Sequence, residues 1–99
     1  MDPSPLSALW SAFQRAGVEG SAAGLGAWLK GASTTERARL EHNLRKVRER
    51  GWRLVHVSTD VAGARAVVRF RLLDGAGLVV DEGLLQCELQ DGQWRLVHA

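Results

Sequence analysis

The sequence predicts an α+β fold in which three N-terminal helices pack on a curved, four-stranded antiparallel sheet. Apolar residues recur at helical spacing as far as Gly51, and beyond it they alternate with polar residues as they do in strands. Asp-Gly pairs at residues 74–75 and 91–92 divide this second half into segments of strand length. Because a chain of 99 residues suits one hydrophobic core, we expect a single domain over residues 1–99.

The first helix is expected over residues 5–16. Ser4 can accept hydrogen bonds from the free N–H groups at its start, and Pro5 loses no hydrogen bond at the first helical position. Gly17 is placed to end the helix. The apolar face of this helix consists of Leu6, Leu9, Trp10 and Phe13.

A second, shorter helix is expected to begin after Ser21. Its apolar side would consist of Leu25, Trp28 and Leu29. Two glycines, at positions 24 and 26, each weaken a helix by up to about 1 kcal/mol relative to alanine. This segment therefore has the weakest helical signal of the three.

The third helix is expected over residues 34–50. Ser33 and Glu36 have the spacing of a capping box, in which each side chain satisfies the backbone N–H of the other. Leu40, Leu44 and Val47 form its apolar stripe. Gly51 can adopt the left-handed conformation that closes a helix, which would place Trp52 against Val47.

Four strands follow, predicted over residues 52–58, 64–73, 78–89 and 93–98, with residues 59–63 as the first turn. If Leu73 pairs with Leu78 and Gln90 with Gln93, Phe70 lies opposite Asp81 and Arg69 opposite Glu82. The core face then contains Ala66, Val68, Phe70, Leu72, Val79, Leu85, Cys87, Leu89, Trp94 and Leu96, with Asp81 and His98 as polar members. The outer face contains Arg65, Val67, Arg69, Arg71, Val80, Glu82, Leu84, Glu88, Arg95 and Val97.

Composition excludes several classes of protein. Apolar residues make up 45% and charged residues 24%, as in ordinary globular domains, and no apolar run approaches the length of a membrane span. Cys87 is the only cysteine, which excludes an internal disulfide and a multi-cysteine zinc site. The N-terminus lacks the features of a secretory signal. We expect a cytoplasmic protein if the chain is complete, and otherwise the soluble part of an exported protein.

Charge is unevenly distributed although the net charge is only +2. Most of the charged side chains in residues 36–71 are basic, whereas most of those in residues 72–99 are acidic. Such a basic half can indicate nucleic-acid binding, but the predicted strand pairing sets the two halves against each other, and no nucleic-acid-binding motif accompanies the charge. We therefore expect no nucleic-acid partner.

The order of elements resembles that of the NTF2-like or cystatin-like superfamily, in particular its small bacterial lumazine-binding-like and uncharacterised members. The matching features are the capped helices, the Gly51-Trp52 transition, the alternating strand over residues 64–73, and the ending from Leu85 to Leu96 with its Asp-Gly turn and Trp-Arg-Leu. The resemblance spans most of the chain and is a pattern of elements without a signature motif.

The resemblance implies a cone-shaped pocket between helices and sheet, and a homodimer formed through the outer face of the sheet. We expect the pocket to be lined by Trp10, Phe13, Trp28, Phe70, Leu85, Cys87 and Trp94. The apolar members of the outer face, Val67, Val80, Leu84 and Val97, would form the dimer face.

Asp81 is the sharpest candidate for chemistry, because burial opposite Phe70 would raise the pKa of its carboxyl toward a value useful in proton transfer. His98 and His56 could act as its partners, or could instead lie at the rim. A β-bulge at residues 81–83 would turn Asp81 to solvent. Cys87 has the features of a small core residue rather than of a nucleophile.

Ketosteroid-isomerase-like enzymes of the superfamily use a tyrosine in the oxyanion hole, and this chain has none. Polyketide-cyclase-like relatives use fewer groups, which leaves a minimal enzyme with Asp81 as general base as the alternative. Our first hypothesis is a non-enzymatic accessory domain that binds a small apolar ligand or a partner protein. We predict no metal, because two histidines and one aspartate are a weak ligand set, and no cofactor.

Overall fold

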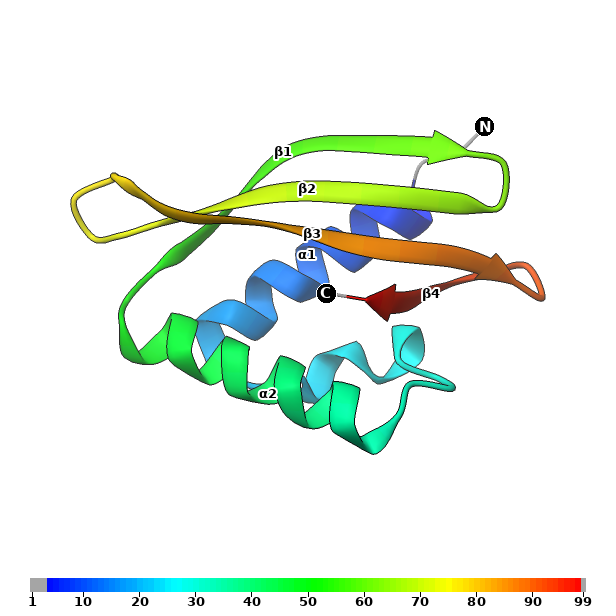
Figure 1. Ribbon diagram of the computed structural model, residues 1–99, viewed down its shortest axis with the longest axis horizontal. Coiled ribbons are helices and arrows are strands. Elements are labelled where there is room, and N and C mark those ends of the chain that lie inside the picture. The colour runs from blue at the N-terminus through cyan, green and yellow to red at the C-terminus, as the bar shows by residue number, and fades with distance from the viewer. Residues whose placement is uncertain (1–3, 99) are drawn as a thin grey trace.

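The structure is a computed structural model that describes residues 4–98, and the Ser4 side chain, the expected cap of the first helix, lies outside the described part. Its helices are α1 (Ser4–Glu19), the 3-10 helix η1 (Ala23–Trp28) and α2 (Thr34–Glu49). Its strands are β1 (Arg53–Ala62), β2 (Arg65–Leu73), β3 (Val79–Gln90) and β4 (Gln93–His98). The strands form one antiparallel sheet in the order β1-β2-β3-β4, with the helices on one face (Figure 1). The predicted α+β class and antiparallel sheet are confirmed.

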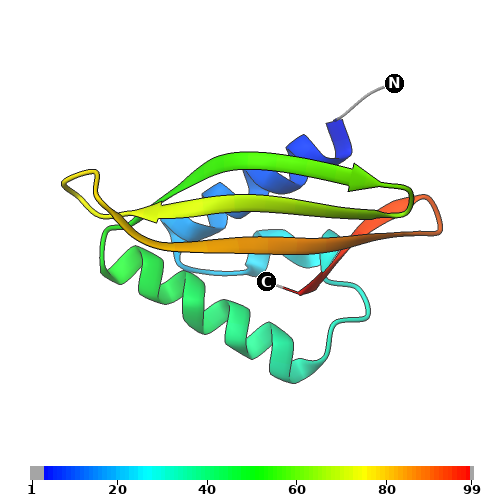
Figure 2. The ribbon, with the colours of Figure 1, turned by 45° about the horizontal axis from the view of Figure 1, so that its top comes forward.

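The core lies between the helices and the concave face of the bent sheet (Figure 2). α1 contacts both β1 and β4, whereas α2 packs mainly on α1 and stands off the strands. The buried core side chains are Leu9, Phe13, Ala16, Leu25, Leu29, Leu40, Leu44, Leu54, Ala66, Val68, Phe70, Leu85, Cys87 and Leu96. None of the helices within residues 4–98 is long and apolar enough to cross a membrane.

The ends of α2 lie at the residues that the sequence signals, and the Ser33 half of the predicted capping box is confirmed. The Ser33 hydroxyl accepts a hydrogen bond from the Glu36 N–H at 3.1 Å. At the other end Gly51 has a φ of 66°, and the Trp52 N–H donates to the Val47 carbonyl at 3.0 Å. This bond closes a Schellman motif, so the end of α2 determines where Trp52 enters the sheet.

The second helix differs from its predicted form, because it is a six-residue 3-10 helix that begins at Ala23. Side chains from α2 hold both of its ends. The Glu41 carboxylate accepts the Ala22 N–H at 2.7 Å, and the Arg37 guanidinium donates to the Leu29 carbonyl at 2.7 Å. With two glycines lowering its helical propensity, tertiary contacts rather than local sequence stabilise this segment.

The first strand is longer than predicted, since residues 59–62 belong to β1 and the turn consists of Gly63 and Ala64. The pairing with β2 shifts between His56 and Ser58, which leaves Val57 as a bulge. Beyond the bulge, residues 58–62 pair with residues 65–69 of β2, so β1 continues through the segment that the sequence predicts as a turn.

The register between β2 and β3 is shifted by two residues from the prediction. Asp74 closes the loop by accepting the N–H groups of Ala76 and Leu78, so that the first pair is Leu73 with Val79 and Val80 forms a bulge. A shift of two preserves the faces of a strand. Asp81 therefore lies opposite Leu72 and not opposite Phe70, whose partner is Gly83. Glu82 pairs with Arg71 at 3.4 Å, whereas Arg69 pairs with Asp60 at 3.8 Å.

Several members of the predicted core face are exposed. Val79 and Leu89 are 51% and 40% exposed, and Asp81 and His98 also lie on the surface. The β2–β3 hairpin extends beyond the helices at one end of the sheet, and β3 extends past them towards β4 at the other (Figure 1). Val79 and His98 also changed face, because bulges at Val80 and Val97 pair them with Leu73 and Gln86 of the outer face. Alternation therefore identifies the face of a residue only as far as the next bulge, and it does not show whether a helix covers that residue.

Candidate functional site

A cavity of about 290 Å³ lies between α2 and the β2–β3 part of the sheet, where α2 stands off the strands. Its wall is mainly apolar, with a few polar groups. The lining residues are Phe13, Leu40, Asn43, Leu44, Lys46, Val47, Trp52, Leu54, Phe70, Leu72, Asp81, Glu82, Gly83 and Leu84. α1 packs directly on β1 and β4, whereas α2 packs on α1 and not closely on the strands. The space between α2 and the strands is therefore not closed by direct packing of these elements.

An aromatic cluster closes the inner end of this cavity. The ring centroids of Phe13 and Phe70 are 5.2 Å apart, and Trp10 lies 5.9 Å from Phe13 and 6.0 Å from Phe70. The Phe70 ring lies over Gly83 in the neighbouring strand, where a side chain would collide with it. The shape of this end therefore depends on the absence of a side chain at Gly83, because the Phe70 ring occupies that space.

Charged side chains lie at the rest of the cavity wall, two cationic groups beside Trp52 and the carboxylate of Asp81 on β3. The Lys46 ammonium lies 5.8 Å from the Trp52 ring centroid, and the Arg50 guanidinium lies 5.4 Å from it. Asp81 is exposed, and its carboxylate accepts the Glu82 N–H at 2.8 Å. The cavity thus combines an apolar wall with Lys46, Asn43 and Asp81, which can orient a polar end of a ligand.

The three residues considered for catalysis lie in different places. Asp81 lines the cavity, while His98 lines a shallow hollow of about 20 Å³ beside Leu40. His56 lies on β1, where its ring is 5.5 Å from that of Trp10 and its Nε2 is 2.7 Å from the Thr59 hydroxyl. Neither histidine therefore lies in the cavity wall that contains Asp81. Within residues 4–98 no group of three metal-ligating side chains assembles.

Of the residues expected to line a pocket, Phe13 and Phe70 line this cavity. Leu85 and Cys87 are buried in the core, and Trp10, Trp28 and Trp94 are partly buried against it. Sequence reasoning missed Trp52 as a lining residue. Its position directly after Gly51 was the available signal, because the Schellman motif turns that side chain back towards α2.

Cys87 is 2% exposed in the centre of β3, and burial raises the pKa of its thiol to about 11. The thiolate is the nucleophilic form of cysteine, so this group is inert near neutral pH. We expect alkylation by iodoacetamide at pH 8 to be slow in the folded protein and fast in 6 M urea, as measured by mass spectrometry.

The same thiol predicts a loss of stability at alkaline pH. An unfolded cysteine ionises with a pKa near 9, so folding favours the neutral thiol. Its contribution is complete below pH 9 and is lost as the pH rises towards 11, up to about 3 kcal/mol. Urea unfolding at pH 8 to 11 measures this fall, and Cys87→Ala should remove its steepest part. An identical pH dependence in the variant would contradict it.

Comparison with known proteins identifies the fold. No family model matches the chain, and no curated protein matches its sequence. Among solved structures, the chain is similar to a Campylobacter jejuni protein named "putative NTF2-like transpeptidase", with a TM-score of 0.60 and 11% sequence identity. The match covers 100% of both chains. The fold is therefore NTF2-like over the whole chain.

Proposed function

We propose that this protein is a non-enzymatic binding domain whose cavity takes a small, largely apolar ligand. The observation that carries the proposal is the mainly apolar wall of the 290 Å³ cavity, with few polar groups beside it. A few polar groups on an apolar wall are characteristic of ligand sites. An apolar side chain of a partner protein could occupy the same space.

The volume and the lining define the ligand class. The cavity is close to the lower end of the roughly 300–1,000 Å³ range of small-molecule sites. It therefore suits a molecule of one or two small aromatic ring systems or a short hydrocarbon. Lys46 and Asp81 carry opposite charges, so a ligand with a neutral hydroxyl end fits both groups, because a hydroxyl can accept from the Lys46 ammonium and donate to the Asp81 carboxylate.

Binding of N-phenyl-1-naphthylamine, an uncharged fluorescent probe made of one naphthyl and one phenyl ring system, tests this function. We expect the probe to become fluorescent on binding and to raise the unfolding midpoint of the protein, because it binds only the folded state. Leu72→Trp, which places an indole against the cavity wall, should weaken binding at least 10-fold. Leu89→Trp is the matched control, because Leu89 lies outside the cavity and is 40% exposed. Equal affinity in the two variants would exclude the cavity as the site.

A minimal enzyme remains the alternative, supported by the position of Asp81 in the cavity wall. An aspartate base beside an apolar site could remove a proton next to a carbonyl group. Such an enzyme should catalyse deuterium uptake by cyclohexenone in D₂O, and Asp81→Asn should abolish the uptake while leaving probe binding unchanged. The binding function instead predicts no protein-dependent uptake. Because neither histidine lines the cavity, we favour binding.

We further propose that the protein dimerises through the outer face of the sheet. Val80 is 42% exposed, and Val67 and Leu84 are partly buried. Val97, the fourth residue expected on this face, forms a bulge in β4 and lines the hollow beside Leu40, so we leave it out of the patch. Removing such a patch from water would stabilise a dimer by roughly 25 cal/mol per Å² of apolar area. Sedimentation equilibrium should give a dimer mass, and Val80→Lys should give the monomer. A monomeric wild-type protein at millimolar concentration would refute the interface.

A further inference from the structure

A second hollow, of about 600 Å³, lies between the C-terminal half of α1 and the start of β1. We call it the α1–β1 groove. It is lined by Ser11, Gln14, Arg15, Gly17, Val18, Val47, Trp52, Arg53, Leu54 and Val55. Val47, Trp52 and Leu54 form the partition between this groove and the proposed ligand cavity, since they line both.

One wall of the groove is an edge of the sheet. β1 is the first strand in the order β1-β2-β3-β4, so it pairs with β2 on one side only. At the groove the Leu54 carbonyl accepts a hydrogen bond from the Gln14 side-chain amide at 3.1 Å. A donor in the groove can therefore reach the backbone of this edge. An incoming strand can supply the same type of donor from its own backbone.

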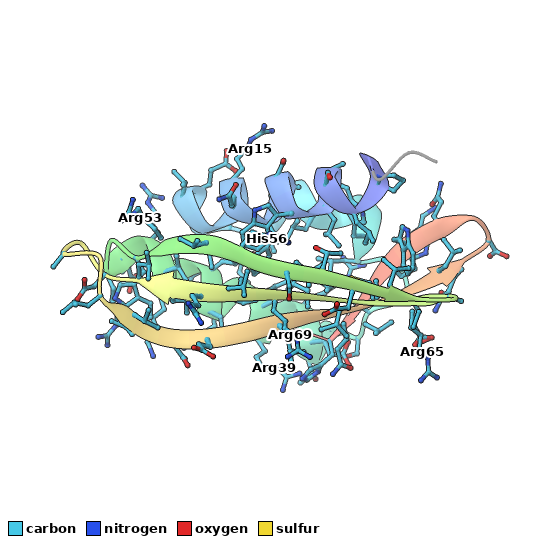
Figure 3. All side chains as sticks on the ribbon, turned by 90° about the horizontal axis from the view of Figure 1, so that it is seen from above. Arg15, Arg39, Arg53, His56, Arg65 and Arg69 are labelled. Carbon is cyan, nitrogen blue, oxygen red and sulfur yellow. The ribbon has the colours of Figure 1, made fainter. Side chains whose placement is uncertain are left out.

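Two arginines on opposite walls give the groove a positive charge. Arg15 comes from α1 and Arg53 from the first position of β1, and both side chains are exposed (Figure 3). The ion pairs found within residues 4–98 use Arg69 and Arg71, not these two. A carboxylate entering the groove would meet guanidinium groups that no acidic side chain of residues 4–98 already holds.

Exposed apolar side chains lie between these charges. Val18 is 79% exposed, the largest value among the exposed large apolar residues, and Val55 is 38% exposed. Both line the groove. The neighbouring lining residue is Gly17. A Cβ at this position would lie 2.7 Å from Leu54 Cδ1, which is too close for the two atoms. The groove thus offers apolar contacts, cations and strand backbone together.

We propose that the α1–β1 groove binds an extended acidic segment of a partner protein, which adds a strand to β1 at residues 53–55. Alternate side chains of a strand point to opposite sides, so Arg53 and Val55 lie on one side of β1 and can meet two residues of the segment that are two positions apart. Residues on the other side of the segment can meet Arg15 and Val18 of α1. Each side of the segment therefore suits one acidic and one β-branched residue. The segment's N–H groups replace Gln14 at the Leu54 carbonyl. A nucleic acid would meet the arginines, but it has no backbone donor pattern for a strand edge.

Selection of displayed random 12-residue peptides on the immobilised full chain tests this proposal. We expect the selected peptides to combine Asp or Glu with Val, Ile or Thr two positions apart, on the same side of the strand. Their affinity, measured by fluorescence polarisation, should fall at least 10-fold in Arg15→Glu and in Arg53→Glu. Arg65→Glu is the matched control, because Arg65 is an exposed arginine at the opposite end of the strands (Figure 3).

Two further variants test the other contacts of the groove. Val18→Asp should weaken the peptides, and it should leave the fold intact because the side chain is exposed. N-methyl groups on alternate residues remove every second backbone N–H, so two such peptides can be compared, one methylated at odd and one at even positions. The peptide that loses the N–H groups facing β1 should bind more weakly than the other, which a side-chain contact alone does not predict.

Four outcomes would overturn the proposal. These are a selection without enriched acidic peptides, affinities equal in Arg15→Glu and Arg65→Glu, competition by N-phenyl-1-naphthylamine, and preferential binding of a single-stranded oligonucleotide through the same arginines. Because the probe reports on the cavity and the peptides on the groove, either proposal can fail while the other holds.

Discussion

Replacing Phe70 by alanine is expected to lower the free energy of unfolding by about 3–5 kcal/mol. The Phe70 side chain is 9% exposed, and its ring packs against Phe13 and Trp10 at centroid distances of 5.2 and 6.0 Å. Truncation removes these contacts and leaves a void between α1 and the centre of the sheet. Urea unfolding monitored by tryptophan fluorescence measures the loss.

Leu89→Ala is the comparison for this substitution, because Leu89 is a large apolar residue at the exposed end of β3. We expect it to cost less than about 1 kcal/mol. Because whole domains are stabilised by about 5–15 kcal/mol, Phe70→Ala could leave much of the protein unfolded, and Phe70→Leu then gives a measurable, smaller loss. A cost for Phe70→Ala no larger than that of Leu89→Ala would show that the aromatic cluster does not hold the two layers together.

Replacing Gly83 by alanine is expected to destabilise the protein by about 1–3 kcal/mol, although alanine is the better residue in a regular strand. A Cβ at this position would lie 2.5 Å from Phe70 Cζ, closer than two carbon atoms can approach. The ring must move, and Phe13 and Trp10 pack against it. Thermal and urea unfolding of the variant measure the cost.

A double-mutant cycle isolates this cause. In a Phe70→Leu background the ring atoms that meet the new Cβ are absent, so Gly83→Ala should cost much less than in the wild type. Additive losses would mean that Gly83 serves the backbone and not the ring. The same cycle reports on the cavity, because Phe70 and Gly83 both line it.

Much of the fold follows from local signals in the sequence. The bounds of α2 are encoded by Ser33 and Gly51, which act through a hydrogen bond and through backbone geometry within a few residues. The β3–β4 hairpin has the predicted register at Gln90 and Gln93, because an Asp-Gly turn allows few alternatives. Asp91 and Gly92 both have positive φ, as such a turn requires.

The candidate site was less predictable. Phe13 and Phe70 follow from periodicity, because residues on the core face of an element are found by spacing alone. The cavity depends instead on the distance between α2 and the strands, which no local pattern contains. Asp81 differs from its prediction for a local reason. Asp74 closes the preceding loop by accepting the N–H groups of Ala76 and Leu78, and the pairing of β3 with β2 is shifted by two residues from the predicted one.

The sequence by itself determined the order of elements, the face of most strand residues and the ends of α2, because these depend on interactions between residues close in the chain. Only the tertiary structure decided the 3-10 form of the second helix, the bulges at Val57 and Val97, and the two hollows on either side of Trp52. Each of these depends on contacts between distant segments, such as Glu41 with Ala22 and Gln14 with Leu54. Local propensity does not determine which distant residues meet, whereas the packing of the helices on the sheet does.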